Sequence, residues 1–405
     1  MSMSLDPIKY YRLPWNYADN AISWLEPTTM CNLQCEGCYR DFNNQEHKSL
    51  DEVRAELELF RKVRKSDCMS IAGGDPLVYP EIVELVGMVR KMGWKPIVNT
   101  NGIALDEPLL RRLKEAGVYG FTLHVDSTQR RPDSQATTET GLNELRLKFA
   151  RMLHEAGGIA CSFNSTVSEK TLHEVPALVD WARENARLVQ TMVFILFRSP
   201  GLTGDFDYYA GGRKIDLGRV YKETDWAGEK FLMAQDVVNK IRESEPDYEP
   251  CAFLNGTARP DSFKWLLANR TVFQGKTMGY MSPRMMELIQ TSNHLFTGRY
   301  LSYASPCATS LGKSSSFFGS LFDGASRRTL FKLLKRSIAK PMGLLRAAHM
   351  QTIMIIQPIN FEADGRQDMC DSCPDITIHE GKLVWSCRME ELRNYGGFLN
   401  TVPKC

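Results

Sequence analysis

The stretch TTMCNLQCEGCYRDFN, residues 28–43, places three cysteines within eight residues near the start of a 405-residue chain. Three residues separate Cys31 from Cys35, and two separate Cys35 from Cys38. A short apolar segment, residues 22–26, precedes this loop and has the length of a β-strand. The loop therefore gathers three thiols directly after a predicted strand.

Three thiolates at these spacings can each bond a different iron atom of one cluster. Iron–sulfur clusters are normally held by four cysteines, so a loop with three leaves one iron open to a substrate or cofactor. A zinc site that lacks its fourth ligand, or buried structural cysteines, are the alternatives. The loop contains no histidine, and structural zinc needs four closed positions, so the spacing favours a cluster.

Around the loop, apolar stretches alternate with amphipathic ones. Many of the amphipathic stretches open on Ser, Asp or Pro and several close on Gly, as helices do. Such alternation predicts parallel βα units, and six units fit an α/β fold with a partial (βα)6 TIM-like barrel better than a complete barrel of ~250 residues. The predicted strands are 22–26, 69–72, 96–100, 120–125, 160–166 and 190–196; the predicted helices are 49–65, 80–93, 106–117, 142–157 and 171–186.

Composition narrows the class of protein. With 43% hydrophobic residues the chain can bury a large core, and a net charge of +2 makes nucleic acid an unexpected partner. We read no secretory signal at the start, and the apolar runs are too short to span a bilayer. We therefore expect a cytoplasmic protein. Eleven cysteines in such a chain indicate metal binding or redox chemistry more than disulfides.

Several motifs together resemble the radical S-adenosylmethionine (SAM) superfamily. CNLQCEGCY resembles its signature loop, and AGGDPLVYP, after the second predicted strand, resembles its glycine-rich motif, with Asp75 where Glu is commoner. The resemblance continues through NTNG at 99–102 and TLHVDS at 122–127, and covers roughly residues 22–199. It implies an enzyme with a [4Fe–4S] cluster on Cys31, Cys35 and Cys38, and with SAM on the open iron. Reductive cleavage of SAM would give a 5′-deoxyadenosyl radical that removes a substrate hydrogen.

The resemblance also implies a set of SAM contacts. Glycine allows close backbone approach to the methionyl amine, and polar side chains at strand ends suit the carboxylate and the ribose. His124 stands where the family often has serine, and a core histidine is its alternative reading. Asn101-Gly102 could also be only a turn. The expected contacts are Tyr39, Gly73, Gly74, Asp75, Asn99, Asn101, His124, Asp126 and Asn164.

After about residue 200 the regular βα pattern is lost. We expect residues 1–20 to be an N-terminal extension, 21–205 the barrel, 206–360 a region that caps the barrel mouth and shapes the substrate site, and 361–405 a cysteine-rich appendage.

The appendage predicts a second metal site. Cys370 and Cys373 form a CxxC motif, and Cys387 follows after a turn marked by Gly381. An auxiliary [4Fe–4S] cluster and a structural zinc ion are both compatible, and we prefer the cluster. Cys307 is the expected fourth ligand, with Cys405 as the alternative. The spacing does not match the seven-cysteine pattern of the peptide-modifying branch of the family.

In residues 327–346, basic residues are interleaved with apolar ones. No acidic residue occurs between Asp323 and Glu362. As a helix broken near Pro341, this segment could rest on an anionic membrane surface. Alternatively, Leu330, Phe331, Leu334 and Ile338 could face the core of the protein. Both readings stay open, and a peptide or nucleic-acid partner for this segment is a third.

The sequence thus predicts a radical SAM enzyme that abstracts hydrogen from an unactivated C–H bond of a small hydrophobic molecule, such as a lipid, isoprenoid or quinone. We expect a reducing partner such as flavodoxin or ferredoxin, and peripheral membrane contact through residues 327–346. A peptide-modifying enzyme is the alternative activity. An iron–sulfur scaffold or electron carrier is the alternative without catalysis.

Overall fold

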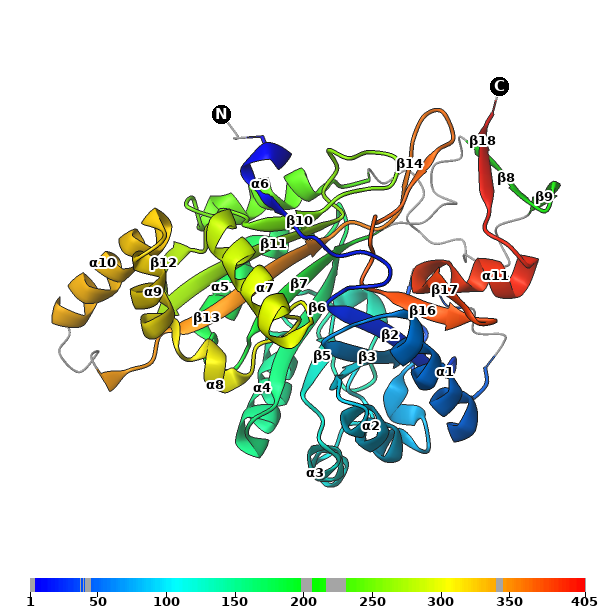
Figure 1. Ribbon diagram of the computed structural model, residues 1–405, viewed down its shortest axis with the longest axis horizontal. Coiled ribbons are helices and arrows are strands. Elements are labelled where there is room, and N and C mark those ends of the chain that lie inside the picture. Colours follow the sequence, from blue (N-terminus) through cyan, green and yellow to red (C-terminus); the bar gives the residue numbers. More distant parts are fainter. Residues whose placement is uncertain are drawn as a thin grey trace.

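Six parallel strands, adjacent in space in the order in which they occur in the chain, form the first half of the central sheet (Figure 1). The structure is a computed structural model and describes residues 4–36, 38, 40, 45–197, 206–215, 231–339 and 345–404. The strands are β2 (Ile22–Thr28), β3 (Cys68–Gly73), β4 (Lys95–Thr100), β5 (Gly120–His124), β6 (Ala160–Val167) and β7 (Thr191–Leu196). Each pairs in parallel with the next, which confirms the predicted partial (βα)6 arrangement.

The predicted helices connect these strands. Local signals place their ends: Ser49 and Glu52 form a capping box before α1, and Asp106 caps α3, which ends at Gly117 with a φ of 96°. Their apolar sides pack on one face of the sheet in the main hydrophobic core. The helices are α1 (Leu50–Val63), α2 (Ile82–Lys91), α3 (Glu107–Ala116), α4 (Asn143–Ala156) and α5 (Val175–Glu184).

The opposite face of the sheet is polar along its middle. Asn99 on β4 donates a hydrogen bond to Ser70 on β3 at 2.7 Å, and His124 on β5 lies beside Asn164 on β6. At one end of this face a separate apolar cluster includes Ile22, the first residue of β2. The polar part of this face is therefore where a polar cofactor could be bound.

The sheet continues beyond the barrel strands. Strand β13 (His349–Ile356) pairs in parallel with β7, and β11 (Trp265–Phe273), β10 (Ala252–Leu254) and β1 (Tyr11–Arg12) follow in that order. Strand β12 (Lys276–Tyr280) forms a hairpin with β11. The segments 1–20 and 206–360 thus both contribute strands to the sheet of the barrel. The alternate residues Ile353 and Ile355 of β13 join the main hydrophobic core.

The C-terminal segment lies at the other edge. Strands β16 (Ile376–His379) and β17 (Lys382–Trp385) form the predicted hairpin, whose turn has positive φ at Glu380 and Gly381, and β16 packs against β2. The remaining elements of this segment are β14 (Asn360–Phe361), β15 (Gln367–Asp368), α11 (Met389–Tyr395) and β18 (Asn400–Pro403), which pairs with β8 (Phe206–Ala210), and β8 pairs with β9 (Arg213–Ile215).

The 206–360 segment also contributes helices. They are α6 (Ala234–Ser244), α7 (Pro283–Thr297), α8 (Pro306–Thr309), α9 (Gly312–Ser320) and α10 (Gly324–Ala339). The last two lie on the far side of the molecule from that edge (Figure 1). Short 3-10 helices occur at Pro7–Lys9, Pro76–Val78, Ser127–Gln129, Leu172–Glu174 and Ser386–Arg388.

Three of the apolar residues of helix α10 do not face the core of the protein, contrary to one of the expectations for this segment. Phe331, Leu334 and Ile338 are exposed, whereas Thr329 and Leu333 are buried. The helix turns its small residues towards the protein because β12 and α9 pack closely on it; a Cβ on Gly279 of β12 would lie 2.1 Å from Thr329 Oγ1. In the described part of the chain, every helix is too short or too polar to cross a membrane.

Candidate active site

The cysteine loop follows β2 and brings its three thiols to the same region. Cys31, Cys35 and Cys38 are all half-buried, and all three are free of disulfide bonds. The Leu33 N–H donates to Cys31 Sγ at 3.4 Å, and Asn101 Nδ2 lies 3.8 Å from the same sulfur. Tyr39, an expected SAM contact, lies outside the described residues.

Burial raises the pKa of Cys31 to about 11, and nearby Asp75 and Cys38 add to this increase. Burial also raises the pKa of Cys35, with a further contribution from Cys38. Both thiols therefore keep their protons at neutral pH unless bound metal replaces them. The described residues contain no three His, Cys, Asp or Glu side chains that converge on one metal ion. The donor set fits a cluster, since each thiol then binds its own iron atom.

The glycine pair allows the cysteine loop to lie directly against the end of β3. The N–H of Gly74 donates to the carbonyl oxygen of Thr28 at 2.9 Å, and the N–H of Asp75 donates to that of Met30 at 2.8 Å. A Cβ on Gly73 would lie 2.2 Å from Thr28 O, and one on Gly74 2.0 Å from Met30 O. The motif therefore positions the loop through backbone contacts that exclude any side chain.

Asp75 is directed into the protein. Its buried carboxylate accepts hydrogen bonds from Thr100 Oγ1 at 2.8 Å, from Asn101 N at 2.8 Å and from Leu77 N at 2.9 Å. Asn101 in turn donates through Nδ2 to Asn32 Oδ1 at 2.7 Å, and its Oδ1 accepts from Ile103 N at 2.9 Å. The Asn101-Gly102 pair is thus a turn and also a contact of the cysteine loop.

His124 and Asp126 form a pair at the end of β5. His124 Nε2 lies 2.6 Å from Asp126 Oδ2 and 3.2 Å from Thr166 Oγ1, and the His124 side chain is 37% exposed. Burial by itself would lower the pKa of His124. The negative charge and the hydrogen bond of Asp126 have the larger effect and raise the pKa of His124 above its usual value. Asp126 is buried, and although burial opposes it, His124 and the hydrogen bonds of Thr128 and Thr166 hold its pKa well below the usual range. Of the two, His124 is the side chain that can reach a ligand.

Two polar atoms near this pair are buried without a partner. They are Ser162 Oγ and Asn164 Oδ1, both on β6. The register of the sheet sets Asn164 beside His124, on the polar face. Buried polar groups are rarely left unsatisfied, so these atoms are suited to accept hydrogen bonds from a bound molecule.

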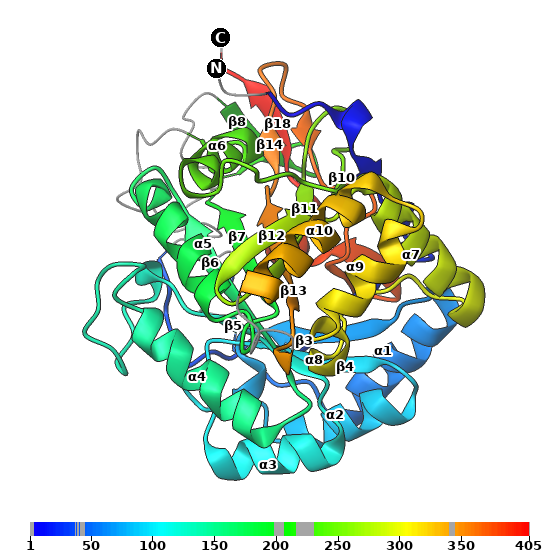
Figure 2. The ribbon, with the colours of Figure 1, turned by 90° about the vertical axis from the view of Figure 1, so that its left-hand side faces the viewer.

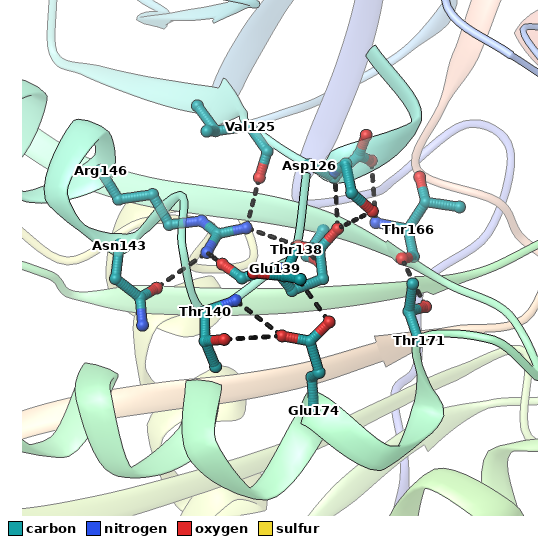
Figure 3. Close-up of polar contacts among 12 residues, drawn as sticks. Val125, Asp126, Thr138, Glu139, Thr140, Asn143, Arg146, Thr166, Thr171 and Glu174 are labelled. Atoms are coloured by element: carbon teal, nitrogen blue, oxygen red, sulfur yellow. Dashed lines mark hydrogen bonds and ion pairs between the residues drawn. The ribbon is translucent and has the colours of Figure 1, made fainter. Parts of the chain in front are cut away.

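The loop between β5 and α4 is held by a polar network that sequence reasoning missed (Figure 3). Arg146 donates to Glu139 Oε2 at 2.6 Å and to the carbonyl oxygen of Val125 at 2.6 Å, and Glu174 accepts from Thr140 N at 2.8 Å. This loop carries Thr128, whose carbonyl oxygen accepts from the N–H of Glu36 in the cysteine loop at 3.0 Å. A Glu and an Arg seven residues apart around a helix start were the available signal.

Arg40 was missed as well, although it follows the last cysteine of the loop by two residues. It is buried and ion-paired with Glu26 on β2 and with Glu390 on α11, the latter at 3.3 Å. Arg40 therefore connects the cysteine loop to the C-terminal segment.

Two of the C-terminal cysteines, Cys370 and Cys373, are buried side by side. The Cys370 and Cys373 side chains form a hydrogen bond that raises the pKa of Cys373, whereas Cys387 is exposed and lies near Cys373. Burial raises the pKa of the neighbouring Asp375 to about 7.

The expected fourth ligand is not placed with this group. Cys307 is exposed on α8, which packs against β13, apart from the β16–β17 hairpin that packs against β2 (Figure 1). Four residues before Cys307, the carbonyl oxygen of Tyr303 accepts hydrogen bonds from Lys95 Nζ at 2.9 Å and from Tyr119 Oη at 3.3 Å. Cys405 lies outside the described residues.

Comparisons with known proteins agree with this geometry. Residues 25–182 match the family model described as the radical SAM superfamily, whose enzymes bind a [4Fe–4S] cluster and SAM. The chain is 28% identical over 42% of its length to a probable GTP 3′,8-cyclase of Methanococcus maripaludis, of which the match covers 58%. It is 29% identical over 45% of its length to a 7,8-dihydro-6-hydroxymethylpterin dimethyltransferase of Methanocaldococcus jannaschii, of which 37% is covered.

Among solved structures, the SuiB protein of Streptococcus suis bound to S-adenosylmethionine has a TM-score of 0.38 and 18% identity, over 56% of this chain and 48% of that one. The chain thus spans about half of the length of the relatives that it matches. Residues 25–182, which include the cysteine loop, the glycine pair and strands β3 to β6, are a radical SAM domain.

Proposed function

We propose that the chain is an enzyme that holds a [4Fe–4S] cluster on Cys31, Cys35 and Cys38 and uses it to cleave SAM. When bound and reduced, such a cluster converts SAM to methionine and a 5′-deoxyadenosyl radical, which abstracts hydrogen from a substrate C–H bond. The observation that supports this most strongly is the set of three half-buried thiols on one loop, seated against the Gly73-Gly74 backbone.

The polar face of the sheet suits the rest of the cofactor. Asn164 Oδ1 is buried without a partner and can accept from the ribose hydroxyls or the methionyl amine. We propose Asn99 and His124 as further contacts, since both lie on this face. Asp75 and Asp126 we propose as positioning residues, because their carboxylates already accept hydrogen bonds from the protein.

For the substrate we propose a small hydrophobic molecule such as a lipid, isoprenoid or quinone, with flavodoxin or ferredoxin as electron donor and a location at the membrane periphery. The exposed Phe331, Leu334 and Ile338 of α10, among basic residues, support this class.

The substrate class is tested by substrate-stimulated turnover. Reduced enzyme with SAM is incubated with a detergent-solubilised lipid extract or with a peptide fraction, and 5′-deoxyadenosine is measured. We expect the lipid extract alone to raise its formation over the rate without substrate. Stimulation by the peptide fraction alone would favour peptide modification. Reduced protein that never forms 5′-deoxyadenosine would be an electron carrier or scaffold.

We also propose an auxiliary [4Fe–4S] cluster on Cys370, Cys373 and Cys387, in view of the hydrogen bond between the first two and the nearness of the third. In a variant with alanine at Cys31, Cys35 and Cys38, about half of the iron and sulfide should remain. Zinc in place of this iron would favour a structural site instead, and complete loss of iron would contradict a second cluster.

A further inference from the structure

The hairpin of α9 and α10 carries large apolar side chains on its solvent side. The two helices lie side by side at one end of the molecule (Figures 1 and 2). Single exposed apolar residues are normal, but a contiguous group marks a surface that binds something. The group is Phe317, Phe318, Leu321, Phe322, Phe331, Leu334 and Ile338, each at least half exposed.

The buried side of the hairpin is made mostly of small residues. On α9 they are Gly312, Ser316 and Gly319, and on α10 they include Thr329 and Ser337. A Cβ on Gly319 would lie 2.8 Å from Ser326 Oγ, so the helices touch closely through these positions. Helices that face lipid pack against each other through small residues and place large apolar residues on the outside. Helical hairpins in water-soluble proteins have the opposite pattern, with large apolar residues inside and polar residues outside.

The pattern along α10 separates these two sides. Phe331, Leu334 and Ile338 are spaced by three and four residues and share one face, whereas the buried Thr329, Leu333 and Ser337 are spaced by four and lie on the opposite face. With 16 residues the helix is too short to span a bilayer. It is therefore suited to lie along a membrane surface.

The exposed charges of the hairpin itself are of one sign, and one of them, Lys332, lies 3.5 Å from the exposed carboxylate of Asp247 outside the hairpin. The acidic residue of the hairpin, Asp323, is buried, where it accepts from Ser282 Oγ and Ser326 N, both at 2.7 Å. Long basic side chains can reach from the edge of an apolar stripe to lipid phosphates. The basic residues are Lys313, Arg327, Arg328, Lys332, Lys335 and Arg336.

We propose that the α9–α10 hairpin docks on an anionic lipid bilayer, with its exposed Phe, Leu and Ile side chains at the headgroup boundary and its basic side chains on lipid phosphates. The docking proposal rests on the membrane location proposed above, and it assigns the membrane contact to a surface that includes α9. It does not depend on SAM cleavage, so failure of either proposal leaves the other to its own test.

The test is co-sedimentation of the full chain with vesicles of equal parts phosphatidylcholine and phosphatidylglycerol. We expect binding that weakens with salt. The variant Arg328→Gln, Lys332→Gln, Lys335→Gln should lose roughly fivefold in partitioning for each residue changed. The variant Phe318→Ser, Phe331→Ser, Ile338→Ser should lose roughly tenfold or more.

A matched control is Leu295→Ser with Phe296→Ser at the end of α7, where the side chains are 76% and 84% exposed. This control should bind vesicles as the unaltered chain does, and all variants should keep its melting temperature, because every replaced side chain is at the surface. Absence of binding at low salt, or an equal loss in the control, would overturn the proposal. So would a dimer that forms without vesicles and is lost in the apolar variant, since a second copy would then cover the surface.

Discussion

Replacing Gly74 with alanine is expected to release the cysteine loop from its seat on β3. The new Cβ would lie 2.0 Å from Met30 O, 2.5 Å from Met30 C and 2.6 Å from Thr29 O. All three are backbone atoms of the segment that leads into Cys31, so the clash cannot be relieved by turning a side chain. Overpacking of this kind costs about 3 kcal/mol or more of unfolding free energy. Urea denaturation and the iron content of the reconstituted protein measure both consequences.

Gly87 in α2 provides the control. A Cβ there meets nothing nearer than Ala116 O at 4.0 Å, and alanine is the better helix former, so Gly87→Ala should raise the unfolding free energy by about 0.5–1 kcal/mol. A Gly74→Ala protein that keeps its stability and its iron would show that the close contact with Met30 does not hold the loop.

Loss of Arg146 should destabilise the β5–α4 loop strongly. Its side chain and that of Glu139 are at most 1% exposed, and it also donates to the carbonyl oxygens of Val125 and Glu139 (Figure 3). Arg146→Met leaves a buried, uncompensated carboxylate, which costs about 3–5 kcal/mol. Adding Glu139→Gln should restore part of this loss, because the stranded charge is then removed. Equilibrium unfolding of the three variants measures the coupling.

The comparison is the ion pair of Arg61 with Glu58 on α1, whose side chains are 59% and 40% exposed. Arg61→Met should change the unfolding free energy by no more than about 0.5 kcal/mol. If the Arg146 and Arg61 variants differ little from each other, the buried network does not hold the loop.

The first half of the fold could be predicted because its signals are local. Apolar runs and helix caps placed all six barrel strands, for example β5, expected at 120–125 and found at Gly120–His124. Strand β13 could not be placed in this sheet, since its partner β7 lies more than 150 residues earlier and pairing at that range leaves no local pattern.

The site was predictable to the level of residue types. The cysteines, the glycine pair and the polar strand ends are visible in the sequence. What each carboxylate faces is not visible in the sequence: Asp75 and Asp126, both expected near the cofactor, accept hydrogen bonds from Thr100 and Thr128. Cys307 was grouped with the C-terminal cysteines by residue type alone, and the fold sets it on α8.

The basic segment shows the same limit. Its composition fitted both a core helix and a membrane-facing one, because periodicity gives the faces of a helix but not what covers them. In the structure Phe331, Leu334 and Ile338 are exposed, because mostly small residues of α9 and α10 occupy the side of the hairpin that faces the protein.

The central claim is that Cys31, Cys35 and Cys38 hold the cluster that cleaves SAM, and formation of 5′-deoxyadenosine tests it most directly. Anaerobically reconstituted protein with a strong reductant should form 5′-deoxyadenosine from SAM, and alanine at any one of the three cysteines should abolish this, while Cys307→Ser, at an exposed position on α8, should not. Unchanged cleavage by the variant with all three cysteines replaced would contradict the account.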